Sequence, residues 1–116
     1  MYLSRTKVKM AEYLKLTGKV VEADLVVHFI DNEDTITAYC PSLELSTYGD
    51  SMADTELAFQ DVFEIFMEDA LEKGTLETIL LELGWSKMAD RFAKGESSPL
   101  PEGTMLQTQH QHLQAA

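Results

Sequence analysis

The chain has 116 residues, of which 45% are hydrophobic and 25% charged, and its formal net charge is −11. This length suits one domain with a sizeable core, and the composition is ordinary for a folded protein. The sequence contains no apolar run of membrane-spanning length, and basic residues interrupt the first sixteen positions, which argues against a signal peptide. We therefore expect a cytoplasmic protein. The single cysteine, Cys40, cannot form an internal disulfide and is expected to be a small buried residue.

The charge is distributed unevenly along the chain. Residues 1–19 carry five basic side chains against one acid, Glu12, whereas residues 20–86 hold sixteen acidic side chains and one base, Lys73. The acidic segment repels phosphate backbones, so nucleic acid is not expected as a partner of the main domain. A basic protein partner fits this charge, although acidity that merely keeps the domain soluble fits it equally well.

The basic segment over residues 1–19 has an ambiguous pattern. Val8, Met10, Leu14 and Leu16 fit a strand, whereas Met10, Ala11 and Leu14 fit a helix. We favour an additional strand here.

Strands are predicted next, over residues 20–49. Apolar and polar residues alternate from position 20 to position 30, as in a half-buried strand, and His28 falls on the polar side. A polar turn at 31–34 leads to a second strand that Pro41 ends, and a short third strand begins at Leu43 and stops at Gly49. We expect a small antiparallel sheet of three to four strands.

A long helix is predicted over residues 51–73, and Gly74 ends it. Ser51 or Asp50 can cap its first amides. Steps of about 100° per residue bring a set of largely apolar side chains to one side of this helix, which should pack on the sheet. These residues are Met52, Phe59, Val62, Phe63, Phe66 and Ala70. A shorter helix, with Thr75 as its cap, should follow and end at Gly84.

Residues 86–116 have a weaker pattern. Positions 95–103 are rich in Gly, Ser and Pro, and positions 104–116 contain four glutamines and two histidines with little to bury. We expect a linker and a mobile tail. Three basic residues follow Trp85, and the pattern of a two-helix DNA reader is not visible there.

The order of elements and the residues at their junctions resemble the HicB antitoxin family over residues 20–85. The resemblance rests on a strand ending in an aromatic residue, a proline–leucine turn, a Gly-Asp-Ser step into a long helix, and a Leu-Gly-Trp ending. The residues that carry these motifs are Tyr39, Pro41, Leu43, Gly49, Ser51 and Trp85. We expect them to be architectural, with Pro41 fixing a bend, Gly49 permitting a positive φ and Ser51 capping the helix.

The resemblance implies a HicB-like α+β domain over residues 20–85, in which a small antiparallel sheet is packed by one long helix and one short helix in a partial RNase H-like fold. It also implies an antitoxin that neutralises a basic, HicA-like, mRNA-cleaving toxin by occlusion, without a cofactor and without enzymatic activity of its own. An orphan regulatory or ligand-binding module on the same scaffold is the competing interpretation. Dimerisation is also expected, because small sheets leave edges that pair readily.

A stripe of acidic side chains is predicted on the long helix, opposite the phenylalanines. We name these residues the acidic stripe: Asp54, Asp61, Glu64, Glu68 and Glu72. Like charges at i, i+4 destabilise a helix slightly, so helix stability does not explain the stripe. It either keeps the domain soluble or attracts a basic toxin by resembling the charge of RNA.

Two other arrangements could carry chemistry. Asp24 and Glu56 could be the carboxylates of a metal-dependent nuclease, but Asp24 should face solvent. His110 and His112 could chelate a metal, but two histidines in a mobile tail bind weakly. We therefore expect neither a catalytic site nor a metal site.

Overall fold

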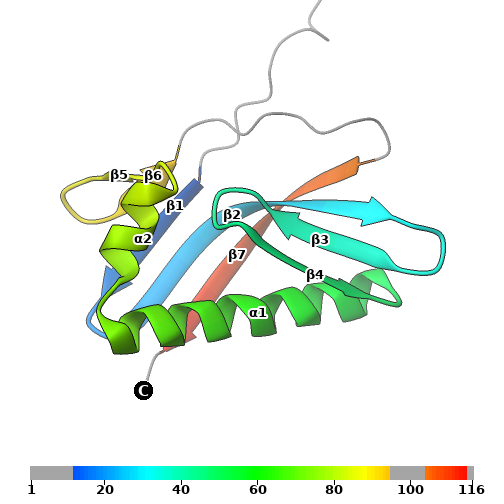
Figure 1. The fold of residues 1–116 in the computed structure, drawn as a ribbon, viewed down its shortest axis with the longest axis horizontal. Coiled ribbons are helices and arrows are strands. Elements are labelled where there is room, and N and C mark those ends of the chain that lie inside the picture. Colours follow the sequence, from blue (N-terminus) through cyan, green and yellow to red (C-terminus); the bar gives the residue numbers. More distant parts are fainter. Residues whose placement is uncertain (1–11, 95–103, 115–116) are drawn as a thin grey trace, which may run out of the picture.

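The computed structural model describes residues 12–94 and 104–114, which form an α+β fold with a seven-stranded sheet and two helices (Figure 1). The strands are β1 (Glu12–Thr17), β2 (Val20–Asp31), β3 (Ile36–Cys40), β4 (Leu45–Gly49), β5 (Ser86–Lys87), β6 (Phe92–Lys94) and β7 (Thr104–Gln114). The helices are α1 (Met52–Lys73) and α2 (Leu76–Glu82). The strand pairs are antiparallel. The predicted α+β class, antiparallel sheet and helix order are confirmed, while the sheet has more strands than the three to four expected.

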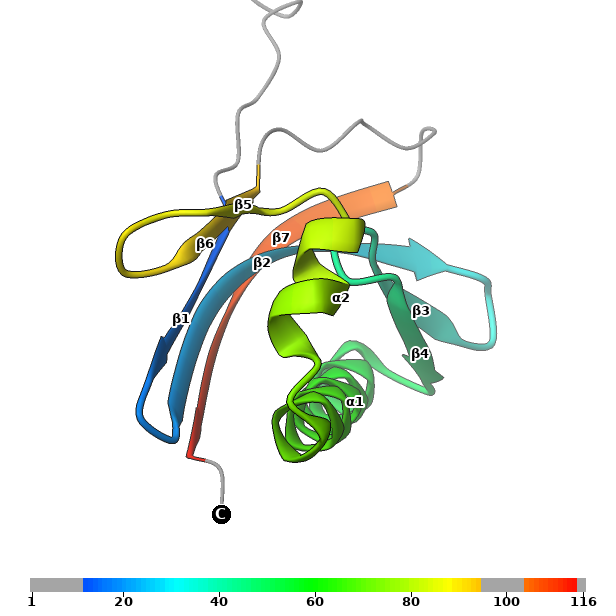
Figure 2. The ribbon, with the colours of Figure 1, turned by 60° about the vertical axis from the view of Figure 1, so that its left-hand side comes forward.

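Strand β2 organises the sheet because it pairs with three other strands. β7 pairs with it from Val20 to Ile30, β1 at residues 20–24 and β3 at residues 28–31. A strand has two edges, and β7 occupies one of them along almost the whole length of β2. β1 and β3 must therefore share the opposite edge, with residues 25–27 between them. Figure 2 shows β1 and β7 on either side of β2.

The core lies between one face of this sheet and the two helices (Figure 2). Alternate residues of β2, from Val21 to Phe29, are buried in it, as the period-2 pattern predicted. Phe59 and Phe63 of α1 are 1% exposed, so this helix packs with its phenylalanines inward. The buried side of α1 is shifted slightly from the predicted one, because Thr55 and Met67 are buried whereas Val62 is half-buried.

Both ends of α1 follow from local chemistry. Ser51 Oγ accepts a hydrogen bond of 3.1 Å from the Asp54 amide, which confirms the predicted cap. Gly74 ends the helix at a φ of 68°, in the left-handed region that favours glycine. At α2, Thr75 occupies the predicted N-cap position, but its side chain makes no capping hydrogen bond.

The expectation of a linker and mobile tail over residues 86–116 was wrong for the part of it that the structure describes. Ser86–Lys87 and Phe92–Lys94 form the β5–β6 hairpin, and Thr104–Gln114 forms β7. The predicted additional strand near the N-terminus is confirmed as β1, which pairs with β6 as well as β2. The rest of the expected tail and residues 1–11 lie outside the described residues. The polar composition of residues 104–114 was misleading, because the edge of β2 supplies the backbone hydrogen bonds that order β7.

Two further predictions are corrected by the structure. His28 lies on the face of β2 that was predicted to be polar, yet it is fully buried, and neither ring nitrogen has a hydrogen-bond partner among the described residues. Gly49 does not adopt a positive φ. A Cβ at this position would lie 2.7 Å from the Thr55 amide nitrogen, so Gly49 is needed because the end of β4 approaches the first turn of α1 closely.

Candidate protein interface

The acidic stripe lies on the outer side of α1, as the helical spacing predicted. All five of its residues, Asp54, Asp61, Glu64, Glu68 and Glu72, are exposed. Thr55, Phe59, Phe63, Met67 and Ala70 of the same helix are buried against the sheet and hold the stripe outward. The structure therefore gathers the predicted acidic residues on one rigid element.

Two apolar side chains accompany the stripe and were not predicted. Leu57 is 60% exposed and Ile65 is 66% exposed, each one helical turn from Asp61. Their signal was present in the sequence, because neither belongs to the phenylalanine side of the helix. A surface of carboxylates with two exposed aliphatic residues can both attract a basic partner and bury apolar area against it.

The carboxylates of the stripe form no ion pair with any described residue. At the end of α1, Lys73 Nζ lies 3.1 Å from Asp69 Oδ1, a carboxylate outside the stripe. Cationic side chains of another protein could therefore form ion pairs with the stripe.

A groove borders α1 on the side of β7. It has a volume of about 420 Å³ and is lined by Ala53, Glu56, Leu57, Gln60 and Gln109. Gln109 Nε2 donates a hydrogen bond of 3.5 Å to Glu56 Oε2 across it. Leu57 belongs both to this groove and to the outer side of the helix, so the groove and the stripe form adjoining surfaces.

The residues that carry the HicB resemblance lie around the β3–β4 turn and the start of α1. Pro41 follows the last residue of β3, and its carbonyl accepts a hydrogen bond from the Glu44 amide. Leu43 and Trp85 are buried, and Trp85 Nε1 donates to the Ser42 carbonyl at 2.8 Å. The Tyr39 ring lies 6.2 Å from that of His28. These contacts fit the architectural role expected of the motif.

A buried carboxylate next to this turn was missed by sequence reasoning. Glu12 is 2% exposed, and its Oε2 accepts hydrogen bonds of 2.8 Å from the Val26 amide and from Ser42 Oγ. Val26 lies in the stretch of β2 that neither β1 nor β3 covers. Glu12 thus supplies an acceptor where the ladder of that edge is interrupted. The available signal was that Glu12 is the one acid in a basic segment.

Cys40 is buried, as expected. Its Sγ lies 3.4 Å from Ser42 Oγ, and burial raises the pKa of the thiol to about 11. The thiol is therefore protonated at neutral pH and poorly suited to act as a nucleophile.

Asp24 and Glu56 are not brought together. Asp24 lies on the face of the sheet away from α1, where its Oδ1 is 2.7 Å from His110 Nδ1. Glu56 instead contacts Gln109, which belongs to the opposite face of β7 because neighbouring strand residues alternate. Within residues 12–94 and 104–114, no three His, Cys, Asp or Glu side chains are grouped so that they could hold a metal ion.

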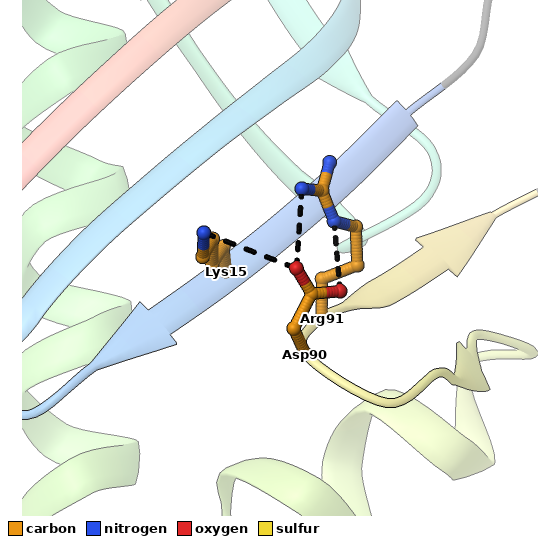
Figure 3. A network of polar contacts seen from close by, with 3 residues as sticks. All are labelled: Lys15, Asp90 and Arg91. Atoms are coloured by element: carbon orange, nitrogen blue, oxygen red, sulfur yellow. Dashed lines mark hydrogen bonds and ion pairs between the residues drawn. The ribbon is translucent and has the colours of Figure 1, made fainter.

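The β5–β6 hairpin is tied to β1 by a small polar network (Figure 3). Asp90 Oδ2 lies 3.9 Å from Lys15 Nζ, and Asp90 Oδ1 lies 3.3 Å from Arg91 Nε. The hydrogen bond from Arg91 lowers the pKa of the Asp90 carboxyl. The Arg91 guanidinium carbon is also 4.9 Å from the centre of the Tyr13 ring. The residues are partly or largely exposed, so the network positions the hairpin and adds little stability.

Neither described helix is long and apolar enough to cross a membrane. No protein-family model, curated protein or solved structure matches the chain.

Proposed function

We propose that the chain is an antitoxin that binds a basic, HicA-like, mRNA-cleaving toxin and neutralises it by covering its surface. The observation that carries this proposal is the outer side of α1, where five exposed carboxylates that form no ion pair with a described residue lie around exposed Leu57 and Ile65. The HicB-like junction residues, from Tyr39 to Trp85, support it independently. The partial RNase H-like arrangement implied by that resemblance belongs to the same proposal.

Neutralisation would follow from charge and shape, without a chemical step. An RNA-cleaving protein presents cationic side chains to its substrate, and the acidic stripe offers them carboxylates in place of phosphates. Leu57 and Ile65 would be buried in the contact and slow dissociation, while the surrounding charges accelerate association.

The test is co-expression with a short, basic protein encoded beside this gene, scored by growth rescue and by the salt dependence of binding. Changing Glu64, Glu68 and Glu72 to lysine should abolish rescue and slow association by at least about tenfold at low salt. The matched control changes Asp34, Glu44 and Glu82 to lysine, because these exposed residues lie outside α1 and give the same change in net charge.

Loss of rescue in both triple variants would show that net charge alone matters and would contradict a specific contact at the stripe. Rescue that survives the Glu64, Glu68 and Glu72 changes with an unaltered salt dependence would reject the stripe as the toxin-binding surface.

The groove beside α1 favours a second candidate, a regulatory or ligand-binding module without a toxin partner. Its lining combines the Glu56 carboxylate and the amides of Gln60 and Gln109 with apolar Leu57, which suits a small polar ligand. The absence of a basic gene neighbour, together with a thermal shift by a small molecule that Gln60→Leu removes, would favour this alternative.

A further inference from the structure

Strand β7 differs in composition from the rest of this acidic chain. Its eleven residues, Thr104–Gln114, include no Asp, Glu, Lys, Arg, Pro or Gly. Folded proteins usually protect an exposed strand edge with charges, prolines, bulges or a covering element. The sequence of β7 supplies none of the protecting residue types.

The direction of the backbone groups of β7 follows from one hydrogen bond of β2. The Val26 amide donates to Glu12, so it points to the edge that β1 and β3 share. Backbone groups alternate along a strand, and the odd-numbered residues of β2 therefore point to β7. In the β2–β7 register, odd-numbered residues of β2 pair with odd-numbered residues of β7, for example Leu25 with Gln109.

The even-numbered residues of β7, including Thr108, His110 and His112, consequently direct their N–H and C=O groups to the outer edge. β2 is the one strand among the described elements that pairs with β7. The other ends of the sheet are less suited to pairing, because β5 has two residues and β4 lies against α1 (Figure 1). β7 is thus the long open edge of the described fold.

We propose that β7 pairs antiparallel with β7 of a second copy of this chain, so that one sheet continues across a two-fold axis. The same even-numbered backbone groups then meet from both sides, as a symmetric antiparallel ladder requires. A second β7 also brings no carboxylate to the contact, whereas the acidic stripes of two copies would repel each other. The added strand would lie on the side of β7 next to the groove that Leu57 and Gln109 line.

A basic toxin is the weaker candidate for this edge. Its cationic side chains would be drawn to the outer side of α1, whereas β7 carries no carboxylate to attract them. The inference is therefore separate from the proposed function, and the two can fail independently.

The test measures the mass of the full chain by sedimentation equilibrium over a wide range of protein concentrations. We expect a dimer of twice the 13.0 kDa chain mass. Thr108→Pro removes an N–H that faces the open edge and keeps the pairing with β2, so it should weaken the dimer at least about tenfold. Thr108→Val keeps that N–H and the strand preference, and it should leave the dimer intact.

Thr108→Lys provides a second disruption that retains the backbone donor, in case the proline variant fails to fold. It should also give a monomer with unchanged circular dichroism. A wild-type chain that is monomeric throughout, or a dimer that persists in the folded Thr108→Pro and Thr108→Lys variants, would overturn the proposal. A monomer that dimerises after residues 1–11 are deleted would instead assign the edge to that segment, and would equally overturn it.

Discussion

His28 combines complete burial with two ring nitrogens that have no hydrogen-bond partner among the described residues. Burial disfavours the charged imidazolium and lowers the pKa of His28 below its ordinary value of 6.5. The unfolded chain therefore binds a proton at this site more readily than the folded chain does. The free energy of unfolding should therefore fall as the pH drops below 6.5. Above pH 6.5 the imidazole is neutral in both the folded and the unfolded chain, and His28 causes no further change in stability.

We predict that His28→Leu removes this pH dependence and raises the free energy of unfolding at about pH 7.5 by roughly 1 kcal/mol, because no unpaired polar nitrogen stays buried. The measurement is urea denaturation of both proteins at about pH 7.5 and about pH 5.5. His112→Gln is the control, because His112 is exposed and its replacement should leave the pH dependence in place. A wild-type protein that is equally stable at both pH values would contradict the assignment to His28.

The step from β4 into α1 shows how an element is positioned by close backbone contact. Gly49 lets the strand end reach Thr55, whose Oγ1 donates to the Ile36 carbonyl or to the Ser51 carbonyl, at 3.1 and 2.7 Å. Thr55 is fully buried, so this contact fastens the first turn of the helix to β3. The first turn of α1, which includes Asp54, is positioned by these contacts.

Gly49→Ala should destabilise the protein by about 2 kcal/mol, because its Cβ would lie within 3 Å of backbone atoms and α1 would have to shift. The loss of the Ser51 cap in Ser51→Ala should cost about 1 kcal/mol and leave the strand-to-helix contact in place. Chemical denaturation of the two variants gives both values. A Gly49→Ala protein as stable as the wild type would show that the helix can move away without cost.

At the scale of the molecule, β7 extends the face of the sheet that packs against α1. Gln111 is 5% exposed and Leu113 packs against the core, so the strand contributes side chains as well as a ladder of hydrogen bonds. Without β7, the edge of β2 would be left open from Val20 to Ile30.

A chain that ends at Lys94 should therefore lose cooperative thermal unfolding, since small domains are stable by roughly 5–15 kcal/mol and this truncation removes a whole strand of the sheet. A chain that ends at Gln114 keeps β7 and should unfold as the full chain does. Calorimetry and near-ultraviolet circular dichroism compare the three proteins. The same melting temperature after truncation at Lys94 would mean that β7 is not integral to the fold.

Local patterns in the sequence determined the elements whose signal is contained within a few residues. The alternation from Val20 predicted β2, the helical spacing placed Phe59 and Phe63 inside and the acidic stripe outside, and Ser51 marked the start of α1. These predictions hold because side-chain direction within one strand or helix depends on its period alone.

Tertiary structure decided the features that depend on residues far apart in the chain. Asp24 and His110 are 86 positions apart, yet the pairing of β2 with β7 brings them into contact. The glutamine-rich composition of β7 gave no sign of that pairing, because the hydrogen bonds come from the edge of another strand. Glu12 and His28 are buried for a related reason. Whether a polar side chain contacts solvent depends on the elements that pack over it. The alternation within its own strand does not reveal that packing.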